Sequence, residues 1–156
     1  MGAYGDDNLL SVSANVEWNQ EQMTEEFKKI GMTYTDEDKT DNMSFRTLEE
    51  VSFLKRGFSP IQMGAQFAPL KLTSILECFN WIHKTHDEDG VIAQNWEMAN
   101  MELSFHSQDV FDHWTCKLQK AIKKTYGKVY AIKPRTAYLS AIRDGDSTLF
   151  DHAQWV

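Results

Sequence analysis

The feature that most constrains the fold is a change of sequence pattern near residue 69. From there on, apolar residues recur every three or four positions, the spacing that places side chains on one face of an α-helix. Pro69 predicts the start of a first helix, and further helices are expected at about 91–105, from Ser107 to near Gly127, and over 136–143. The predicted apolar faces comprise Leu72, Ile75, Leu76, Phe79 and His83 in the first helix, Ile92, Trp96, Ala99 and Leu103 in the second, and Val110, Trp114, Leu118 and Ala121 in the third.

The first half has a different pattern, with short apolar runs separated by turn residues. Its opening stretch, AYGDDNLLSV, predicts a β-hairpin whose first strand ends at Tyr4 and whose second strand extends to about Ser13. Gly5 and Asp6 form the predicted tight turn, because glycine adopts the positive φ that such a turn needs. The hairpin therefore has two adjacent aspartates, Asp6 and Asp7, at its tip.

A helix and two short strands are expected after the hairpin. The helix is predicted over about 20–30, because Asn19 begins a capping-box pattern and Gly31 is a suitable end. Short strands are predicted at 32–35 and 51–56. A small β-containing half followed by a helical half predicts an α+β fold.

Charge is distributed unevenly along the chain. The net charge of −7 argues against a general nucleic-acid-binding protein. Residues 1–50 hold 4 Lys and Arg against 12 Asp and Glu, whereas residues 117–156 hold 8 against 3. A basic end of this kind indicates either a surface that faces a polyanion or a solvated helix face, and taken by itself it favours the solvated face.

Composition also indicates where the protein is expected to be located and how its cysteines, tryptophans and histidines are used. The sequence contains no apolar run long enough to cross a membrane and no secretory leader is expected. Cys78 and Cys116 fall in predicted helices, and we expect both to be reduced, intracellular core thiols. The tryptophans are expected mostly in helix cores. The histidines lack metal-ligand spacing with the cysteines and are expected at the surface or hydrogen-bonded in the core: His83, His86, His106, His113 and His152.

The two adjacent carboxylates are easiest to explain if a cation binds between them. Mg²⁺ prefers oxygen ligands and is often held by one or two carboxylates together with water and substrate phosphates. Side chains alternate along an extended strand, so Asp6 and Asp7 can reach one site only where the backbone turns sharply. An ordinary polar turn is the alternative, and the pair alone leaves it open.

Three short sequence motifs occur in the same order as in a known family of enzymes. YGDD, flanked by apolar strand residues, resembles motif C of viral RNA-dependent RNA polymerases. KKIGMTYTDEDKT (28–40) resembles motif D of the picornavirus-like polymerases, and FLKR (53–56) resembles their motif E. The segments 68–82 and 101–114 resemble the first thumb helices of picorna-like viruses. The resemblance runs from residue 1 to about residue 143.

The resemblance implies a fold and a reaction. It predicts a partial palm subdomain at 1–68, made of a β-hairpin, a helix and short strands, then an α-helical thumb at 69–143 and a variable tail at 144–156. The implied activity is that of an RNA-directed RNA polymerase, which adds nucleotides to the 3′ end of a primer strand with Mg²⁺ (or Mn²⁺) as cofactor.

The resemblance also implies catalytic roles for three residues. Asp6 corresponds to the motif C aspartate that binds the metal pair, and Asp7 corresponds to its supporting neighbour, so both are implied metal ligands. Lys39 corresponds to the motif D lysine that protonates the departing pyrophosphate. Without the resemblance, Lys39 would be interpreted as a solvated loop lysine among acidic neighbours.

Other positions have implied supporting roles. Lys55 and Arg56 correspond to motif E residues that bind the phosphates near the 3′ end of the growing strand. Tyr4 and Gly5 belong to the motif C turn. Asn8 is either a strand residue whose amide faces the turn or a primer contact, and the sequence does not choose between them.

The motifs known as A and B, which complete the palm in this family, have no counterpart in the chain. We therefore expect the chain to be the C-terminal palm and thumb of a longer viral polyprotein and to be inactive alone. The implied partners are template-primer RNA, nucleoside triphosphates, the rest of the polymerase and other viral replication proteins. The implied location is the host-cell cytoplasm, at membrane-associated replication complexes.

Two alternatives remain open. One is a non-enzymatic module, an acidic hairpin joined to a helical domain for protein interaction, which the overall acidity and the missing motifs would suit. The other is a reverse transcriptase palm, whose hairpin also carries paired aspartates. The glycine before the aspartates and the FLKR stretch favour the RNA polymerase.

Overall fold

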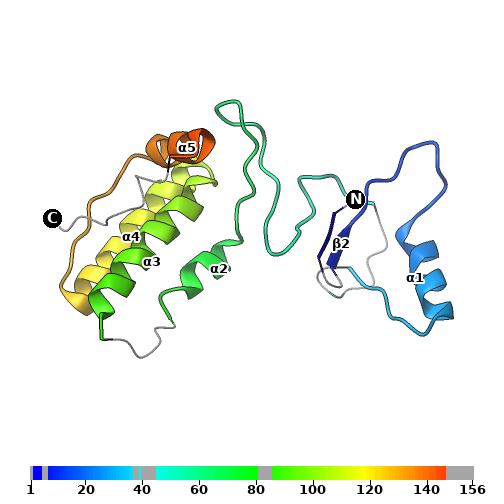
Figure 1. The fold of residues 1–156 in the computed structure, drawn as a ribbon, viewed down its shortest axis with the longest axis horizontal. Coiled ribbons are helices and arrows are strands. Elements are labelled where there is room, and N and C mark those ends of the chain that lie inside the picture. Colours follow the sequence, from blue (N-terminus) through cyan, green and yellow to red (C-terminus); the bar gives the residue numbers. More distant parts are fainter. Residues whose placement is uncertain (1, 5–6, 37–38, 40–44, 81–85, 147–156) are drawn as a thin grey trace. The chain divides into compact units, whose positions relative to one another are not determined.

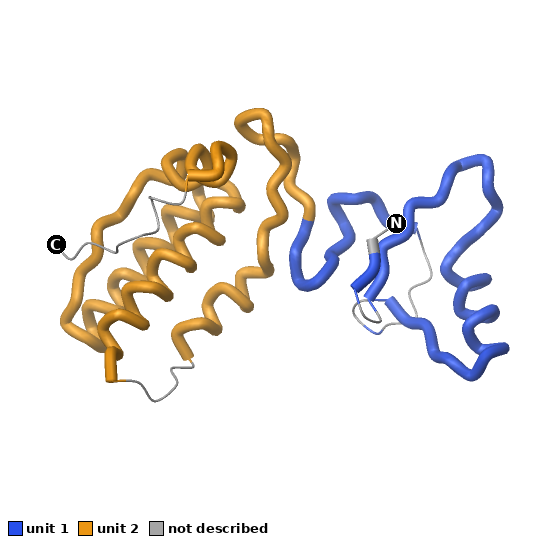
Figure 2. Tube along the Cα trace, in the orientation of Figure 1, with its two compact units in different colours: residues 1–57 blue, residues 58–156 orange. Residues whose placement is uncertain are grey.

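The computed structural model divides the chain into two compact units, Met1–Gly57 and Phe58–Val156 (Figure 2). The first contains a hairpin and one helix, and the second contains four helices in its described part. The predicted boundaries of palm, thumb and tail stay predictions. The structure describes residues 2–4, 7–36, 39, 45–80 and 86–146 (Figure 1).

The predicted hairpin is formed by β1 (Gly2–Tyr4) and β2 (Asp7–Leu9). The strands are antiparallel, with the pairs Gly2↔Leu9, Ala3↔Asn8 and Tyr4↔Asp7. The prediction that the second strand extends to about Ser13 is wrong, because β2 ends at Leu9. A strand extends only as far as its hydrogen-bonding partner, and Gly2, the first residue of β1, lies opposite Leu9.

α1 (Gln20–Lys29) begins and ends where the sequence predicts. The Asn19 side chain accepts a hydrogen bond from the Gln22 backbone N–H at 2.9 Å, and the Gln22 side chain accepts one from the Asn19 N–H at 3.0 Å. This reciprocal pair is the expected capping box. Gly31, just beyond the helix, has a φ of 77°, which glycine adopts at little cost.

The two short strands predicted after α1 do not form. Residues 32–35 are irregular. Phe53 and Arg56 bond to each other instead, through N–H···O contacts of 2.8 and 3.0 Å. The two residues between them, Leu54 and Lys55, have φ values of 53° and 63°, the positive values that a two-residue turn needs. A strand requires a partner, and the described residues provide none beside these segments.

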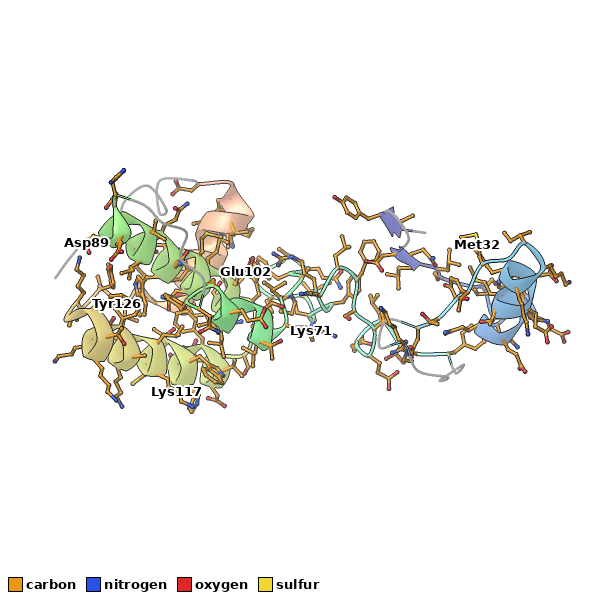
Figure 3. All side chains as sticks on the ribbon, turned by 90° about the horizontal axis from the view of Figure 1, so that it is seen from below. Met32, Lys71, Asp89, Glu102, Lys117 and Tyr126 are labelled. Atoms are coloured by element: carbon orange, nitrogen blue, oxygen red, sulfur yellow. The ribbon has the colours of Figure 1, made fainter. Side chains whose placement is uncertain are left out.

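The helices of the second unit are α2 (Leu72–Glu77), α3 (Glu88–Ser104), α4 (Gln108–Tyr126) and α5 (Arg135–Asp144) (Figure 1). α3 contacts each of the other three. α3 and α4 are antiparallel, so Asp89 and Tyr126 lie at the same end of the pair (Figure 3). An ion pair links Asp89 of α3 to Lys128, which lies two residues after the end of α4. Among the helices of the described residues, none is long and apolar enough to cross a membrane.

α2 is shorter than the helix predicted from Pro69. It begins at Leu72, because the preceding backbone is extended at Lys71 and the Leu70 carbonyl is bound by the His106 ring at 2.9 Å. A helix starting at Pro69 would need that carbonyl for its own first turn. His83, which was predicted to extend the apolar face, lies outside the described residues.

The predicted apolar face of α3 is confirmed, since Ile92, Trp96, Ala99 and Leu103 are all buried. The predicted face of α4 is confirmed in part: Trp114 and Leu118 pack against the core, whereas Ala121 is exposed. The most buried residues of α4, which are Phe111, Thr115 and Ile122, were not predicted. The Thr115 hydroxyl donates to Asn100 Oδ1 at 2.6 Å inside the core. Thr115 is thus buried with a hydrogen-bond partner, as a buried polar group requires, although apolar spacing alone does not predict its burial.

α3 also carries a buried carboxylate. Glu97 accepts hydrogen bonds from Lys133 Nζ and from the Tyr138 hydroxyl, each at 3.0 Å. Burial, together with the negative charge of Glu97, raises the pKa of Tyr138. The charge of Glu97 is thereby paired inside the fold, as a buried charge must be.

The two cysteines are both free, and only one belongs to the core. Cys78 is half-buried against the cluster around Ile75, and this burial raises the pKa of its thiol to about 11. Cys116 is exposed on α4, so its expected core position is wrong. With 3.6 residues per turn, Cys116 lies on the side of α4 away from the buried Phe111 and Ile122. This is the side that also carries the exposed Lys117 and Lys123.

The two thiols should differ in reactivity. The thiolate is the reacting species, so Cys116 should be alkylated at least about tenfold faster than Cys78 near pH 8. Stopped-flow labelling of the 156-residue chain, with Cys78→Ser and Cys116→Ser variants to assign each phase, measures the two rates. Equal rates for both thiols would contradict the burial of Cys78.

Candidate functional site

The tip of the hairpin carries the predicted metal ligands. Asp7 is the first residue of β2 and pairs with Tyr4. The Asp7 carboxylate is exposed, and it makes no hydrogen bond or ion pair to the described residues. Tyr4 is also exposed, at 70% of its surface. Gly5 and Asp6, the predicted turn residue and the predicted principal ligand, lie outside the described residues.

A cavity of about 170 Å³ lies in the first unit. Its walls come from β2 and the residues after it, the start of α1, residues 34–36 and residues near 51. Trp18 and Met23, which have the spacing of a hydrophobic staple around the Asn19 cap, both contribute to its lining. The cavity thus places the hairpin, the helix and the segment before Lys39 around one space.

Asn8 connects two of these walls. The Tyr34 hydroxyl donates a hydrogen bond to Asn8 Oδ1 at 2.8 Å. The Tyr34 ring is stacked on Phe27 of α1, with 5.1 Å between ring centroids and 27° between planes. Asn8 is therefore a strand residue whose amide oxygen faces Tyr34, an arrangement that neither alternative from the sequence described. The sequence gives no sign of it, because Tyr34 lies far along the chain in an irregular segment.

Lys39 lies in a loop whose start is fixed. Its side chain is exposed, its φ is 55°, and its backbone N–H donates to the Asp36 carbonyl at 3.0 Å. Asp36 is 9% exposed and lies 3.9 Å from Arg46, measured between carboxylate and guanidinium. Asp36 is one of the acidic neighbours of Lys39, and the sequence did not predict its pairing with Arg46. No periodic pattern reveals it, because both partners are in irregular segments.

Lys55 lies in the two-residue turn after Phe53, and Arg56 closes that turn by bonding to Phe53; neither belongs to a strand. Lys55 is exposed and Arg56 is half-buried. The expectation that a rigid strand holds these cations is therefore wrong, although the turn is closed by two backbone hydrogen bonds. Asp7, Lys39, Lys55 and Arg56 all belong to the first unit.

A second polar surface lies on α4. Its lysines Lys117, Lys120, Lys123 and Lys124 are exposed, and no acidic residue occurs from His113 to Tyr126. Figure 3 shows the side chain of Lys117 directed away from the helices of this unit. The opposite side of α4 faces the core, so this basic face is left to the solvent.

Metal ligation by the histidines was not expected. His106 is hydrogen-bonded to the Leu70 carbonyl, as predicted for a core histidine. His83 and His152 lie outside the described residues. Within the described ranges, no three His, Cys, Asp or Glu side chains are grouped as a metal site would require. Of the tryptophans, Trp96 is fully buried and Trp18 is 37% exposed.

The chain matches a known family over most of its length. The family described as Viral RNA-dependent RNA polymerase matches residues 1–123. This range includes the hairpin, Lys39, the turn at 54–55 and nearly all of α4.

Several viral polyproteins are similar in sequence. The replicase polyprotein of Acute bee paralysis virus (strain Rothamsted) is 41% identical over 142 residues, which cover 87% of this chain and 8% of that protein. The replicase polyprotein of Drosophila C virus (strain EB) is 40% identical over 124 residues, covering 76% of the chain and 7% of the relative. The genome polyprotein of Rice tungro spherical virus (strain Vt6) is 36% identical over 129 residues, covering 78% and 4%.

The chain thus spans less than a tenth of the length of each of these relatives. On the family match and these identities, the chain belongs to the viral RNA-dependent RNA polymerases.

Proposed function

We propose that this chain provides the motif C, D and E part of the palm and the thumb of an RNA-directed RNA polymerase. The observation that carries the proposal is the β1–β2 hairpin, which begins its second strand at an exposed aspartate in a chain of this family. On this assignment the first unit contributes to the reaction centre and the helices of the second unit contribute to the thumb. The activity belongs to the whole polymerase, of which the chain would be one part.

The proposed reaction is nucleotidyl transfer. The 3′ oxygen of the primer forms a bond to the α-phosphorus of a nucleoside triphosphate, and the bond from that phosphorus to the bridging oxygen breaks. The 3′-hydroxyl loses its proton to water, and pyrophosphate leaves with the electron pair of the broken bond. A proton delivered to the leaving oxygen makes this departure easier.

The hairpin tip suits a divalent cation. Asp7 offers carboxylate oxygens that are exposed and unoccupied by described residues, and Mg²⁺ accepts one or two carboxylates with water completing its shell. Asp6 and Asp7 would hold Mg²⁺ or Mn²⁺, with further ligands from elsewhere in the palm. A bound cation of this kind would neutralise charge on the phosphates.

Lys39 is the proposed proton donor to pyrophosphate. A lysine ammonium has protons to give and no competing acceptor role. The exposed side chain of Lys39 extends from a turn that is closed at Asp36, so the residue is accessible to a substrate. Lys55 and Arg56 are the proposed contacts to primer phosphates, presented by a closed turn.

RNA is the proposed partner of the basic face of α4. Four exposed lysines in a stretch of α4 without acidic residues form a surface of the kind that binds a phosphate backbone. The apolar side of α4 is occupied by the core, so this helix has no free apolar face to insert into a lipid bilayer. We further propose that the polymerase works in the host-cell cytoplasm, with other viral replication proteins at membrane-associated complexes.

Removal of the principal metal ligand should abolish synthesis. In a polymerase that contains this chain with the rest of the palm and the fingers, Asp6→Ala should lower nucleotide incorporation by more than about 10³-fold, because the cation supplies several kcal/mol of charge stabilisation. Primer-extension assays measure the loss, and Asp109→Ala, an exposed carboxylate on α4, is the matched control. Normal extension by the Asp6 variant would overturn the catalytic assignment.

Loss of the proposed proton donor should slow chemistry and spare binding. In the same polymerase, Lys39→Leu should reduce the single-nucleotide incorporation rate by about 10²–10³-fold, within the range for a lost general acid. RNA affinity should hardly change, because Lys39 acts on the leaving group. Lys28→Leu, on the exposed side of α1, is the matched control. An equal loss of RNA affinity would assign Lys39 to RNA binding instead.

The basic face of α4 should contribute salt-dependent RNA affinity. The double change Lys120→Glu and Lys124→Glu in the 156-residue chain should weaken duplex RNA binding and lower the slope of log affinity against log salt by about one per lost phosphate contact. Fluorescence anisotropy over a salt series measures both. Lys28→Glu with Lys29→Glu on α1 gives the same change in net charge. Equal weakening by both pairs would show that only net charge matters.

A further inference from the structure

Asn8 and Tyr34 hold together two segments that the proposed function assigns to different tasks. Asn8 is the residue directly after Asp7 in β2, and Tyr34 precedes the turn that carries Lys39. The Tyr34 hydroxyl donates to Asn8 Oδ1 at 2.8 Å, a distance typical of a good O–H···O bond. Both side chains are half-buried, which shields the bond from competition by water.

The hydroxyl of Tyr34 is aimed by α1. The Tyr34 ring is stacked on the ring of Phe27, in the last turn of α1, with 5.1 Å between the ring centroids. The chain leaving the helix is also held, because the Met32 N–H donates to the Phe27 carbonyl at 3.0 Å. These two contacts restrict the Tyr34 ring, so the position of its hydroxyl is set by α1.

The segment from Tyr34 to Lys39 is fixed at a second point. Asp36, two residues after Tyr34, is buried and ion-paired with Arg46. Its carbonyl accepts the backbone N–H of Lys39 at 3.0 Å. The backbone of Lys39 is therefore bonded to Asp36. The segment that leads to Asp36 is in turn bonded to the hairpin through Tyr34.

The acceptor of the Tyr34 hydrogen bond, Asn8, is joined through the backbone to Asp7, a predicted metal ligand. Successive side chains of a strand point to opposite faces, and the exposed Asp7 and the half-buried Asn8 follow this alternation. One face of β2 bears Asn8, which is bonded to Tyr34, and the opposite face bears the exposed Asp7. A displacement of Tyr34 would shift β2 and the Lys39 turn relative to each other.

We propose that Asn8 and Tyr34 are positioning residues, which set the distance between the Asp7 carboxylate and the Lys39 ammonium through their mutual hydrogen bond. The proposal rests on the proposed function of Asp7 and Lys39. This role requires neither residue to touch substrate. The bond acts on the rate of nucleotide addition and leaves the binding of nucleotide and RNA unchanged.

The decisive experiment is a double-mutant cycle in the complete polymerase. Tyr34→Phe removes the hydroxyl and keeps the stacked ring, and Asn8→Ala removes the acceptor opposite Ala3. Each change should lower the single-nucleotide incorporation rate by about 3–10-fold, the range expected for one lost hydrogen bond, with the nucleotide and RNA dissociation constants unchanged. The double variant should be no slower than the worse single variant, because both changes remove the same bond.

A second cycle tests whether the effect passes through Lys39. In the Lys39→Leu background, Tyr34→Phe should cause no further loss of rate. Tyr126→Phe, an exposed tyrosine at the end of α4, is the matched control and should leave the rate unchanged. The fraction of active enzyme is taken from the burst amplitude, so a variant that merely folds poorly loses amplitude and keeps its rate.

Three results would overturn the proposal: an unchanged rate in Tyr34→Phe, multiplicative losses in the double variant, or a full loss from Tyr34→Phe in the Lys39→Leu background. The last result would place Tyr34 and Asn8 in a general structural role. Failure of the proposed function is seen separately, as a normal rate in Lys39→Leu alone.

Discussion

Burial of α3 is the constraint on which the second unit depends. Trp96 and Leu103 are fully buried, and the helix contacts α2, α4 and α5. A helix covered on several sides must bury polar residues as well, and each of these then needs a partner. Glu97 is paired with Lys133 and Tyr138, and Asn100 is paired with Thr115. The core is therefore specified by polar pairs in addition to apolar volume, and the faces of α4 and α5 follow from them.

The first unit is organised differently. Among its described residues, Asp36 is the only one that is buried, so no apolar core fixes the hairpin. Its arrangement depends on individual contacts, namely the capping box of α1, the stacking of Phe27 with Tyr34 and the bond from Tyr34 to Asn8. Contacts of this kind fix position without much stabilisation energy, because each contributes only about 1 kcal/mol. The proposed reaction centre is thus built on local geometry, whereas the stability of the chain resides mainly in the helices.

The first unit has several surfaces to which the proposed function gives a purpose. On the proposed function, these surfaces would meet other parts of the polymerase. The cavity beside the hairpin and the exposed apolar residues near it, such as Val16 and Phe45, suit such contacts. The proposed assignment of Asp6, Asp7 and Lys39 gives these surfaces a common purpose around nucleotide addition.

The sequence by itself determined the features that depend on near neighbours: the hairpin, the capping box of α1, the extents of α3, α4 and α5 to within a few residues, and the buried face of α3. These follow from caps, glycines and apolar spacing, which act within one or two turns of chain. Only the tertiary structure decided the rest. Residues 32–35 and 51–56 have strand-like composition, yet they are not strands because no partner lies beside them. The positions of three polar side chains depend on partners far away in the sequence: Thr115 is paired with Asn100, Asp36 with Arg46, and Asn8 with Tyr34. A polar pair between distant residues produces no periodic pattern in the sequence, so it could not be predicted.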